Sequence, residues 1–255
     1  MARSGRRVSI GTMEVLVEGL VKAYGRKPVL DGLDLRLEGG LACLIGLNGA
    51  GKTTLLGCLA GCLVPREGRI RFDGARFSMD DLALRRRIAW LPDQPFTYAE
   101  HKVIEHISMV VRAYQVEVDA ALEKRLLGWL EEFGMMDLAE ERMGQLSRGQ
   151  HYKAGLIAHM AVAPELWLLD EPFASGMDPR GLAAFRREAR ARVEAGATVL
   201  YSTQILEIAV SFCDRMLVLD GGRLVADLTR AELDSMPQAG PGSLEERFRD
   251  LQDQP

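Results

Sequence analysis

Short apolar runs separated by turn residues dominate the first part of the chain. Glu14–Glu18 is the first run typical of a strand, and short alternating segments with turn residues between them continue through Leu33–Leu37. Alternation of apolar and polar residues indicates strands with one buried face. We therefore expect the N-terminal part of the chain to form an antiparallel β subdomain.

Further along, the apolar runs become continuous and alternate with helical patterns. Leu41–Ile45 has the unbroken apolar character of a strand buried on both faces, and Lys52–Leu59 beyond the next turn has the pattern of a helix. More strand signals occur at Arg69–Phe72, Ile88–Leu91, Leu166–Leu169, Thr198–Tyr201 and Met216–Leu219. Alternating strands and helices predict an α/β fold with a mostly parallel sheet and helices on both sides.

Between about residues 100 and 163 the apolar residues follow a helical spacing alone. They recur every three or four positions at Val103, Ile107, Val110, Val111, Tyr114, Leu122, Leu126, Leu130 and Phe133. This stretch is therefore predicted to be a helical insert. We expect a flexible leader over residues 1–12, one main domain over 13–233, and a C-terminal tail over 234–255 that holds one short helix.

The composition narrows the class of protein. The 255 residues carry a formal net charge of -4, which argues against nucleic acid as the main partner because backbone phosphates select basic surfaces. The apolar runs are far shorter than the ~20 residues needed to cross a bilayer. We therefore expect a cytoplasmic chain, so that any membrane-spanning part of a complex must come from another polypeptide.

A glycine-rich loop carries the strongest chemical signal. The segment from Gly46 to Thr53 fits the pattern G-x-x-x-x-G-K-[ST], with a buried strand before it and a helix after it. Backbone N–H groups in such a loop form an anion-binding nest, the lysine adds a positive charge for the β and γ phosphates, and the threonine hydroxyl is a ligand for Mg²⁺. The residues predicted to hold ATP and magnesium here are Gly46, Leu47, Asn48, Gly49, Ala50, Gly51, Lys52, Thr53 and Thr54.

Two acids follow the apolar strand Leu166–Leu169. With a phosphate loop upstream, Asp170 is predicted to lie beside Mg²⁺, and Glu171 to act as the general base for an attacking water. Between these two sites Ser147 and Gln150 form a capping box that opens a helix. The capping function and a phosphate-binding function are compatible, because a capped helix N-terminus also attracts phosphate.

Taken together, these motifs resemble the nucleotide-binding domain of ABC transporters, most closely that of small bacterial exporter ATPases. The resemblance covers about Met13 to Leu233, and the Leu-Ser-x-Gly-Gln signature at Leu146–Gln150 separates this family from other phosphate-loop ATPases. Tyr24 falls where the family has an aromatic ring that stacks on adenine. A buried core tyrosine is the alternative for that residue.

The resemblance also implies partners. In this family two ATP-binding domains dimerise head to tail, so Ser147, Gly149 and Gln150 would contact the ATP of a second subunit, which is the same or a different chain. A separate transmembrane permease subunit would dock on the helical insert, with Phe96 and Tyr98 as contacts or, alternatively, as core residues. The implied location is the cytoplasmic face of the cell membrane.

Two positions depart from the family pattern. After Leu91-Pro92 the family has a glutamine that senses Mg²⁺ and the attacking water, whereas this chain has Asp93 followed by Gln94. We assign this function to Asp93, with Gln94 as the rival. The second departure is Gln204, which replaces the histidine that contacts the γ-phosphate and orients the water. A glutamine amide donates a hydrogen bond but never becomes a cation, so we expect slower hydrolysis or a mixed dimer.

The direction of transport depends on weaker signals. The Leu91–Asp93 form and the segment Ser243–Phe248, which resembles a short closing helix of exporter ATPases, both favour export. We therefore expect an ATP-hydrolysing subunit of an exporter. The alternatives are the ATPase of an importer, a catalytically slow ATP-gated regulatory subunit, and an ABC protein acting on ribosomes or DNA, which would generally carry two such domains or a long coiled coil.

Overall fold

The computed structural model describes residues 12–78, 80–173, 177–236, 243 and 246. The expected leader, apart from Thr12, lies outside these residues. Most of the expected tail helix at Ser243–Phe248 does so as well. Residues 174–176, which follow the two acids, are also outside the described part.

The N-terminal half of the fold contains an antiparallel sheet, as the alternating pattern predicts. Its strand order is β2-β1-β4-β5, and every pairing in it is antiparallel. The strands are β1 (Glu14–Tyr24), β2 (Lys27–Glu38), β4 (Glu67–Phe72) and β5 (Ala75–Arg76). Alternate residues of β1 and β2 are buried, so the sheet has one face in the core and one towards solvent.

The second sheet is mostly parallel and has the strand order β10-β9-β3-β8-β7-β6. Its members are β3 (Gly40–Ile45), β6 (Ile88–Leu91), β7 (Leu166–Leu169), β8 (Thr198–Thr203), β9 (Arg215–Asp220) and β10 (Arg223–Thr229). Only the β9–β10 pairing is antiparallel. The continuous apolar runs predicted this arrangement, because strands covered on both faces need apolar residues at every position.

Successive residues of β3 belong to two different hydrophobic cores. Cys43 and Ile45 pack in the core shared with the helices of residues 103–162, while Ala42 and Leu44 pack in the core shared with the N-terminal sheet. This follows from the two-residue period of a strand. The parallel sheet is therefore sandwiched between two layers, and the loops at its carboxyl ends are held from both sides.

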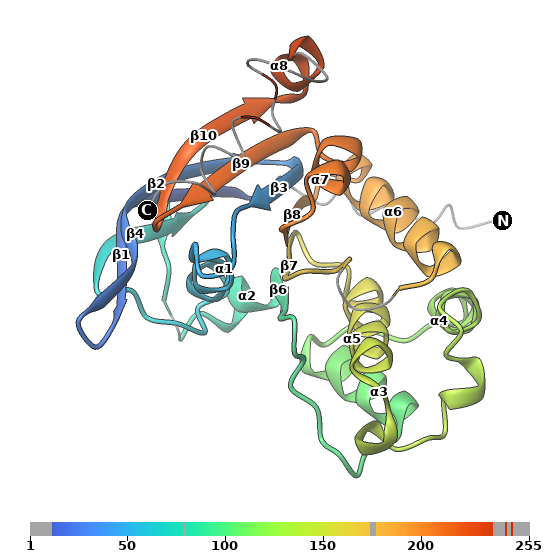
Figure 1. Ribbon diagram of the computed structural model, residues 1–255. Helices are drawn as coiled ribbons and strands as arrows, with labels where there is room; N and C mark the ends of the chain where they lie inside the picture. Colours follow the sequence, from blue (N-terminus) through green and yellow to red (C-terminus); the bar gives the residue numbers. More distant parts are fainter. Residues whose placement is uncertain (1–11, 79, 174–176, 237–242, 244–245, 247–255) are drawn as a thin grey trace, which may run out of the picture.

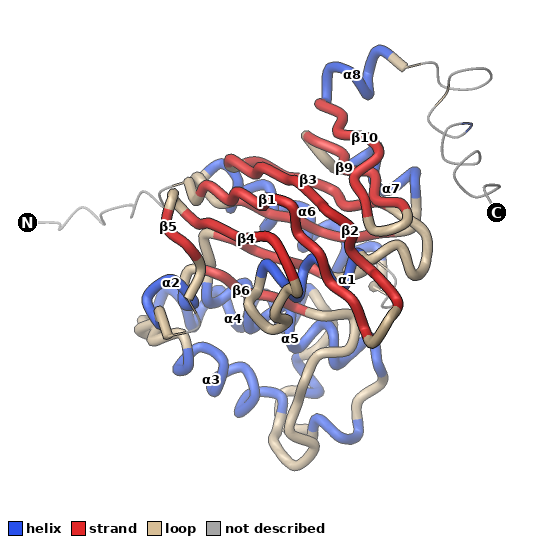
Figure 2. The backbone as a smooth tube through the Cα atoms, turned by 90° about the vertical axis from the view of Figure 1, so that its left-hand side faces the viewer, coloured by secondary structure: helices blue, strands red, loops and turns tan. Residues whose placement is uncertain are grey.

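The helices surround this sheet in two groups. Figure 1 shows α3 (Val103–Ala113), α4 (Ala120–Glu132) and α5 (Arg148–Val162) gathered below the sheets, where they follow β6 and precede β7. The same group lies beneath the red strands in Figure 2. Two short 3-10 turns join α4 to α5, at Met136–Leu138 and Met143–Gln145. The remaining helices are α1 (Lys52–Leu59), α2 (Leu82–Arg86), α6 (Pro179–Glu194), α7 (Leu206–Phe212) and α8 (Arg230–Ser235).

Several of these elements are absent from the expectations drawn from sequence, among them β10, α2 and α8. Strand β10 has no fully buried residue, so its apolar positions give only a weak strand signal. The helices α2 and α8 have five and six residues, too few for a helical repeat to show. Each depends on a side-chain cap at its N-terminus, from Asp81 and Thr229 respectively.

Candidate functional site

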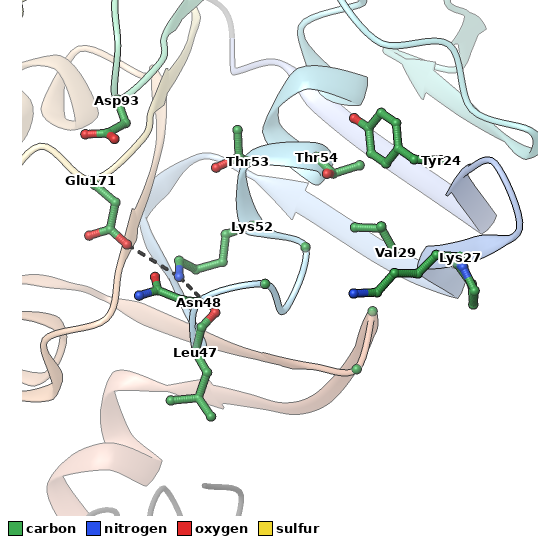
Figure 3. Close-up of a pocket in the computed structure, with 15 residues that line it drawn as sticks. Tyr24, Lys27, Val29, Leu47, Asn48, Lys52, Thr53, Thr54, Asp93 and Glu171 are labelled. Atoms are coloured by element: carbon green, nitrogen blue, oxygen red, sulfur yellow. Dashed lines mark hydrogen bonds and ion pairs between the residues drawn. The ribbon is translucent and has the colours of Figure 1, made fainter.

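A pocket opens where the loop after β3 turns into α1. Its volume is about 590 Å³. The residues that line it are Tyr24, Lys27, Pro28, Val29, Leu47, Asn48, Gly49, Gly51, Lys52, Thr53, Thr54, Asp93, Glu171, Gly221 and Gly222. Seven of the nine residues predicted to bind ATP from the loop pattern line this one cavity, which Figure 3 shows.

Glycine is required at two points of the loop for steric reasons. Gly51 has a φ of +110°, and a Cβ atom there would lie 2.8 Å from the carbonyl oxygen of Val29. A Cβ atom on Gly46 would lie 2.3 Å from the carbonyl oxygen of Leu219. The loop is therefore pressed against its neighbouring strands, and its backbone wall can stay close to a bound phosphate chain. Gly46 and the buried Ala50 belong to the same loop but do not line the pocket.

Lys52 supplies a positive charge inside the pocket. Its side chain is only 6% exposed, and its Nζ donates to the backbone carbonyl oxygens of Gly46 at 2.8 Å and of Leu47 at 3.3 Å. The same Nζ lies 3.4 Å from Oε1 of Glu171. The ammonium group is thus positioned by the loop and by a carboxylate, in the place where the pattern predicts contact with the β and γ phosphates.

The two predicted acids lie at the carboxyl end of β7. Asp170 is 1% exposed and accepts hydrogen bonds from the hydroxyl of Thr53 at 2.6 Å and from the hydroxyl of Ser202 at 2.6 Å. Ser202 Oγ also accepts the backbone N–H of Glu171 at 2.9 Å. One hydroxyl on the neighbouring strand β8 therefore orients both acids. Sequence reasoning missed Ser202, although its place at the end of the next parallel strand indicates that it lies beside them.

Glu171 has the properties of a proton acceptor. Its backbone has a φ of +49°, which is unusual for a residue with a side chain and turns it away from the strand direction. Within the described residues its Oε2 is buried and has no hydrogen-bond partner. Burial raises the pKa of this carboxyl above the ordinary glutamate value, and the charge of Lys52 opposes the rise. Such an environment keeps a carboxylate basic, and one of its oxygens has no hydrogen-bond partner among the described residues.

The two ends of the pocket differ in chemistry. Figure 3 shows Tyr24 and Lys27 at one end and Asp93 with Glu171 at the other. The Tyr24 side chain is 52% exposed, so the alternative of a buried core tyrosine is wrong, and its ring is open to a flat partner. Sequence reasoning missed five other lining residues, Lys27, Pro28, Val29, Gly221 and Gly222. The last two belong to the β9–β10 turn, which no local motif marks.

The signature residues lie outside this pocket. Ser147 is the N-cap of α5, where its Oγ accepts the backbone N–H of Gln150 at 3.3 Å and its own N–H donates to Oε1 of Gln150 at 2.8 Å. The capping box predicted from sequence is confirmed. Because Oγ acts there as an acceptor, its own proton stays available for another group. Ser147 is exposed and Gly149 is half-buried.

Two further candidates also lie away from the pocket lining. Gln94 is exposed and lines a neighbouring hollow of about 380 Å³ together with Pro95, Leu146, Arg148 and His151. Gln204 is exposed directly after β8. Their assignment to metal sensing and to phosphate contact therefore stays a prediction.

The protein oxygens suit magnesium only together with a phosphate ligand. Among the described residues no cluster of three or more His, Cys, Asp or Glu side chains could hold a metal ion. The Thr53 hydroxyl and the Asp170 carboxylate are adjacent, and both are oxygen donors of the kind that Mg²⁺ prefers. Mg²⁺ commonly takes one or two protein ligands and completes its octahedron with phosphate oxygens and water. The pair fits that requirement.

Comparison with known proteins agrees with this site. A family model described as ABC transporter matches residues 30–174, which include the phosphate loop, the signature and the two acids. The ABC-type transporter ATP-binding protein EcsA of Bacillus subtilis is 34% identical over 85% of this chain and 87% of its own length. The daunorubicin resistance ATP-binding protein DrrA3 of Streptomyces coeruleorubidus is 37% identical over 86% of this chain and 69% of its own length.

Solved structures give the same result. A structure described as the ATP-binding subunit of an ABC transporter has a TM-score of 0.83 and 30% identity, and covers 94% of this chain and 99% of its own. Other matching relatives are named for opposite directions of transport, such as Nod factor export ATP-binding protein I and sulfate/thiosulfate import ATP-binding protein CysA.

The chain belongs to the ABC transporter family and is an ABC-type ATP-binding protein. No helix in the described part of the chain is both long and apolar enough to cross a membrane.

Proposed function

We propose that this chain hydrolyses ATP with magnesium and passes the resulting conformational change to a separate transmembrane permease, as the energising subunit of an exporter. One observation carries the proposal. The phosphate loop holds a buried lysine 3.4 Å from a glutamate that has a free, buried carboxylate oxygen. A phosphate-binding cation and a candidate general base thus share one pocket.

The residues divide the chemistry among them. The loop N–H groups and Lys52 bind the phosphate chain, and the exposed ring of Tyr24 stacks on the base at the other end of the pocket. Thr53 and Asp170 would hold Mg²⁺, which neutralises charge on the β and γ phosphates when bound. Glu171 accepts a proton from the attacking water through its unpartnered oxygen. Ser202 donates to the Asp170 carboxylate and accepts the backbone N–H of Glu171, so it fixes the two acids relative to each other.

Half of a working site comes from a second ATP-binding subunit. The support is that the signature residues are exposed and lie outside the pocket of their own chain. The free hydroxyl proton of Ser147, at the positive end of α5, suits a phosphate oxygen that a facing subunit presents. A symmetric head-to-tail pair of this chain is the simplest assembly, and a mixed pair is the alternative.

Export is the finer part of the proposal. It is supported by Leu91-Pro92-Asp93 at the end of β6 and by several relatives named for export or drug resistance. The importer alternative keeps the support of the relative CysA. The test is ATP-driven movement of radiolabelled candidate compounds in membrane vesicles of known orientation that hold the chain and its permease. Accumulation on the side of the ATPase would contradict export.

A slow, ATP-gated regulatory subunit is the second candidate, and Gln204 is the residue that favours it. We would measure ATP turnover of the chain with its permease for wild type, Glu171→Gln and Gln204→His. The proposal of an active ATPase predicts measurable turnover in wild type and at least a hundredfold loss in Glu171→Gln, because the proton acceptor is gone. Turnover that is absent in wild type and present in Gln204→His would instead support the regulatory candidate.

A further inference from the structure

The nucleotide pocket contains a negative charge that needs explanation. Asp93 lines the cavity in which the polyanionic ATP is proposed to bind, and it lies at the same end as Glu171. A second carboxylate in such a place repels phosphate unless a cation compensates for it. Lys52 is already engaged by Glu171 and by two carbonyl oxygens. Before Mg²⁺ is bound, the compensating charge for Asp93 therefore comes from another side chain.

Arg148 provides that charge from the signature helix. Its Nη2 forms an ion pair with Oδ2 of Asp93, 55 positions earlier in the chain, while Oδ1 of Asp93 is buried without a hydrogen-bond partner among the described residues. One oxygen of the Asp93 carboxylate is thus paired with Arg148 on α5, and the other has no hydrogen-bond partner among the described residues. The pair therefore joins a residue that lines the nucleotide pocket, Asp93, to one that lines the second hollow, Arg148.

The position of Arg148 is unfavourable for α5 taken by itself. It is the first residue of the helix, where the macrodipole is positive, and the first turn of α5 contains no acid to balance it. A positive charge there becomes favourable only through the distant Asp93. The preference for acids at a helix N-terminus is therefore not followed at Arg148. Such an exception is expected of a residue that serves the nucleotide pocket rather than the stability of the helix.

We propose that Arg148 is a positioning residue for nucleotide binding, which neutralises Asp93 at the pocket wall and ties that carboxylate to the N-terminus of the signature helix. The inference rests on the proposed function. Replacement of Arg148 by a neutral side chain leaves Asp93 as an uncompensated anion facing the phosphates. Nucleotide affinity then falls, and it falls most at low ionic strength, where charges are least screened.

The test is titration of the purified chain with Mg²⁺ and the non-hydrolysable β,γ-imido analogue of ATP, at low and high salt. Arg148→Gln is expected to weaken binding about fivefold at low salt and less at high salt, and Arg148→Lys is expected to keep most of the affinity. Asp93→Asn removes the repulsive charge, so adding Arg148→Gln to it should change the affinity less than twofold. Arg142→Gln is the matched control, since Arg142 is about as exposed as Arg148 and forms an ion pair with Glu100 at 2.6 Å, away from the pocket.

The possible results distinguish a failure of the Arg148 inference from a failure of the proposed function. Equal effects of Arg148→Gln and Arg142→Gln would overturn the inference, as would equal effects of Arg148→Gln in the presence and absence of Asp93. A wild-type chain that does not bind the analogue would overturn the proposed function itself. Thermal unfolding of each variant shows that it is folded. A purely structural clamp would be broken by Asp93→Asn as well as by Arg148→Gln, so both would weaken binding, whereas the inference predicts that Asp93→Asn alone does not.

Discussion

The phosphate loop and the signature helix α5 both present backbone N–H groups at a helix N-terminus, but only the phosphate loop lines the nucleotide pocket. At α1 the loop is buried against neighbouring strands, and a lysine that is 6% exposed points into a cavity of about 590 Å³. At α5 the N-cap Ser147 is exposed, and its capping box satisfies the first turn of the helix. The first region is complete within one chain, and the second is not.

This difference has a thermodynamic meaning. A ligand of the phosphate loop meets groups that are already fixed, so little ordering is required when it binds. The signature residues Ser147 and Gly149 do not line the nucleotide pocket of their own chain, so in the proposed assembly they gain a ligand only when a facing subunit presents one. In the proposed function the two regions therefore contribute to different steps, the first to nucleotide binding and the second to the closing of a dimer around that nucleotide.

The comparison predicts that a buried lysine matters for binding in only one of the two regions. Lys52→Ala is expected to weaken binding of the ATP analogue by about 3 kcal/mol, roughly a hundredfold, because charge-assisted hydrogen bonds to phosphate are lost. Isothermal titration calorimetry measures this loss. The control is Lys153→Ala on α5, whose side chain is 12% exposed and donates to the carbonyl oxygen of Phe133 at 3.0 Å. Comparable losses in both variants would contradict the division between the regions.

The second prediction concerns a substitution in the signature helix. Ser147→Ala should leave binding of the analogue to the isolated chain unchanged and lower the ATPase rate of the assembled complex at least tenfold, since the hydroxyl contacts the nucleotide of the facing subunit. It should also cost about 1 kcal/mol in free energy of unfolding through loss of the cap. Thr229→Ala removes the same type of capping box from α8 and serves as control. If Thr229→Ala lowers the rate as much as Ser147→Ala does, the effect on rate is one of stability.

The sequence predicts the two regions to different depths. The loop Gly46–Thr54 was predicted from local pattern because its chemistry resides in consecutive residues. Ser202 and Gly222 escaped prediction because they reach the site through the order of strands β3, β8 and β9 in the sheet, which a linear pattern does not contain. The same holds for Arg148 and Asp93, whose pairing depends on how α5 packs beside the end of β6. A site formed by consecutive residues can therefore be predicted from the sequence, whereas contacts that depend on strand order and helix packing cannot.

The smallest predicted effect concerns the helical layer that carries the signature. Burial, reinforced by the neighbouring His159, His101 and His151, lowers the pKa of His106 on α3 from its ordinary 6.5 to about 4, and burial lowers that of His159 on α5 as well. Between pH 6.5 and about 4 the unfolded chain therefore binds protons that the folded chain excludes. The contribution of these histidines to the free energy of unfolding is fully present above pH 6.5. It is lost as the pH falls, by at most about 1.4 kcal/mol per pH unit for each such histidine.

Urea unfolding at a series of pH values between 7.5 and 4.5 measures that slope. His106→Gln should flatten it while lowering the stability at pH 7.5, because a buried site is disturbed but no longer titrates. Ile107→Val, at a buried neighbouring position, should lower the stability and keep the slope of the wild type. An unchanged slope in His106→Gln would mean that acid acts on the fold elsewhere. The expected result places acid sensitivity in the layer around the signature helix, apart from the pocket at the phosphate loop.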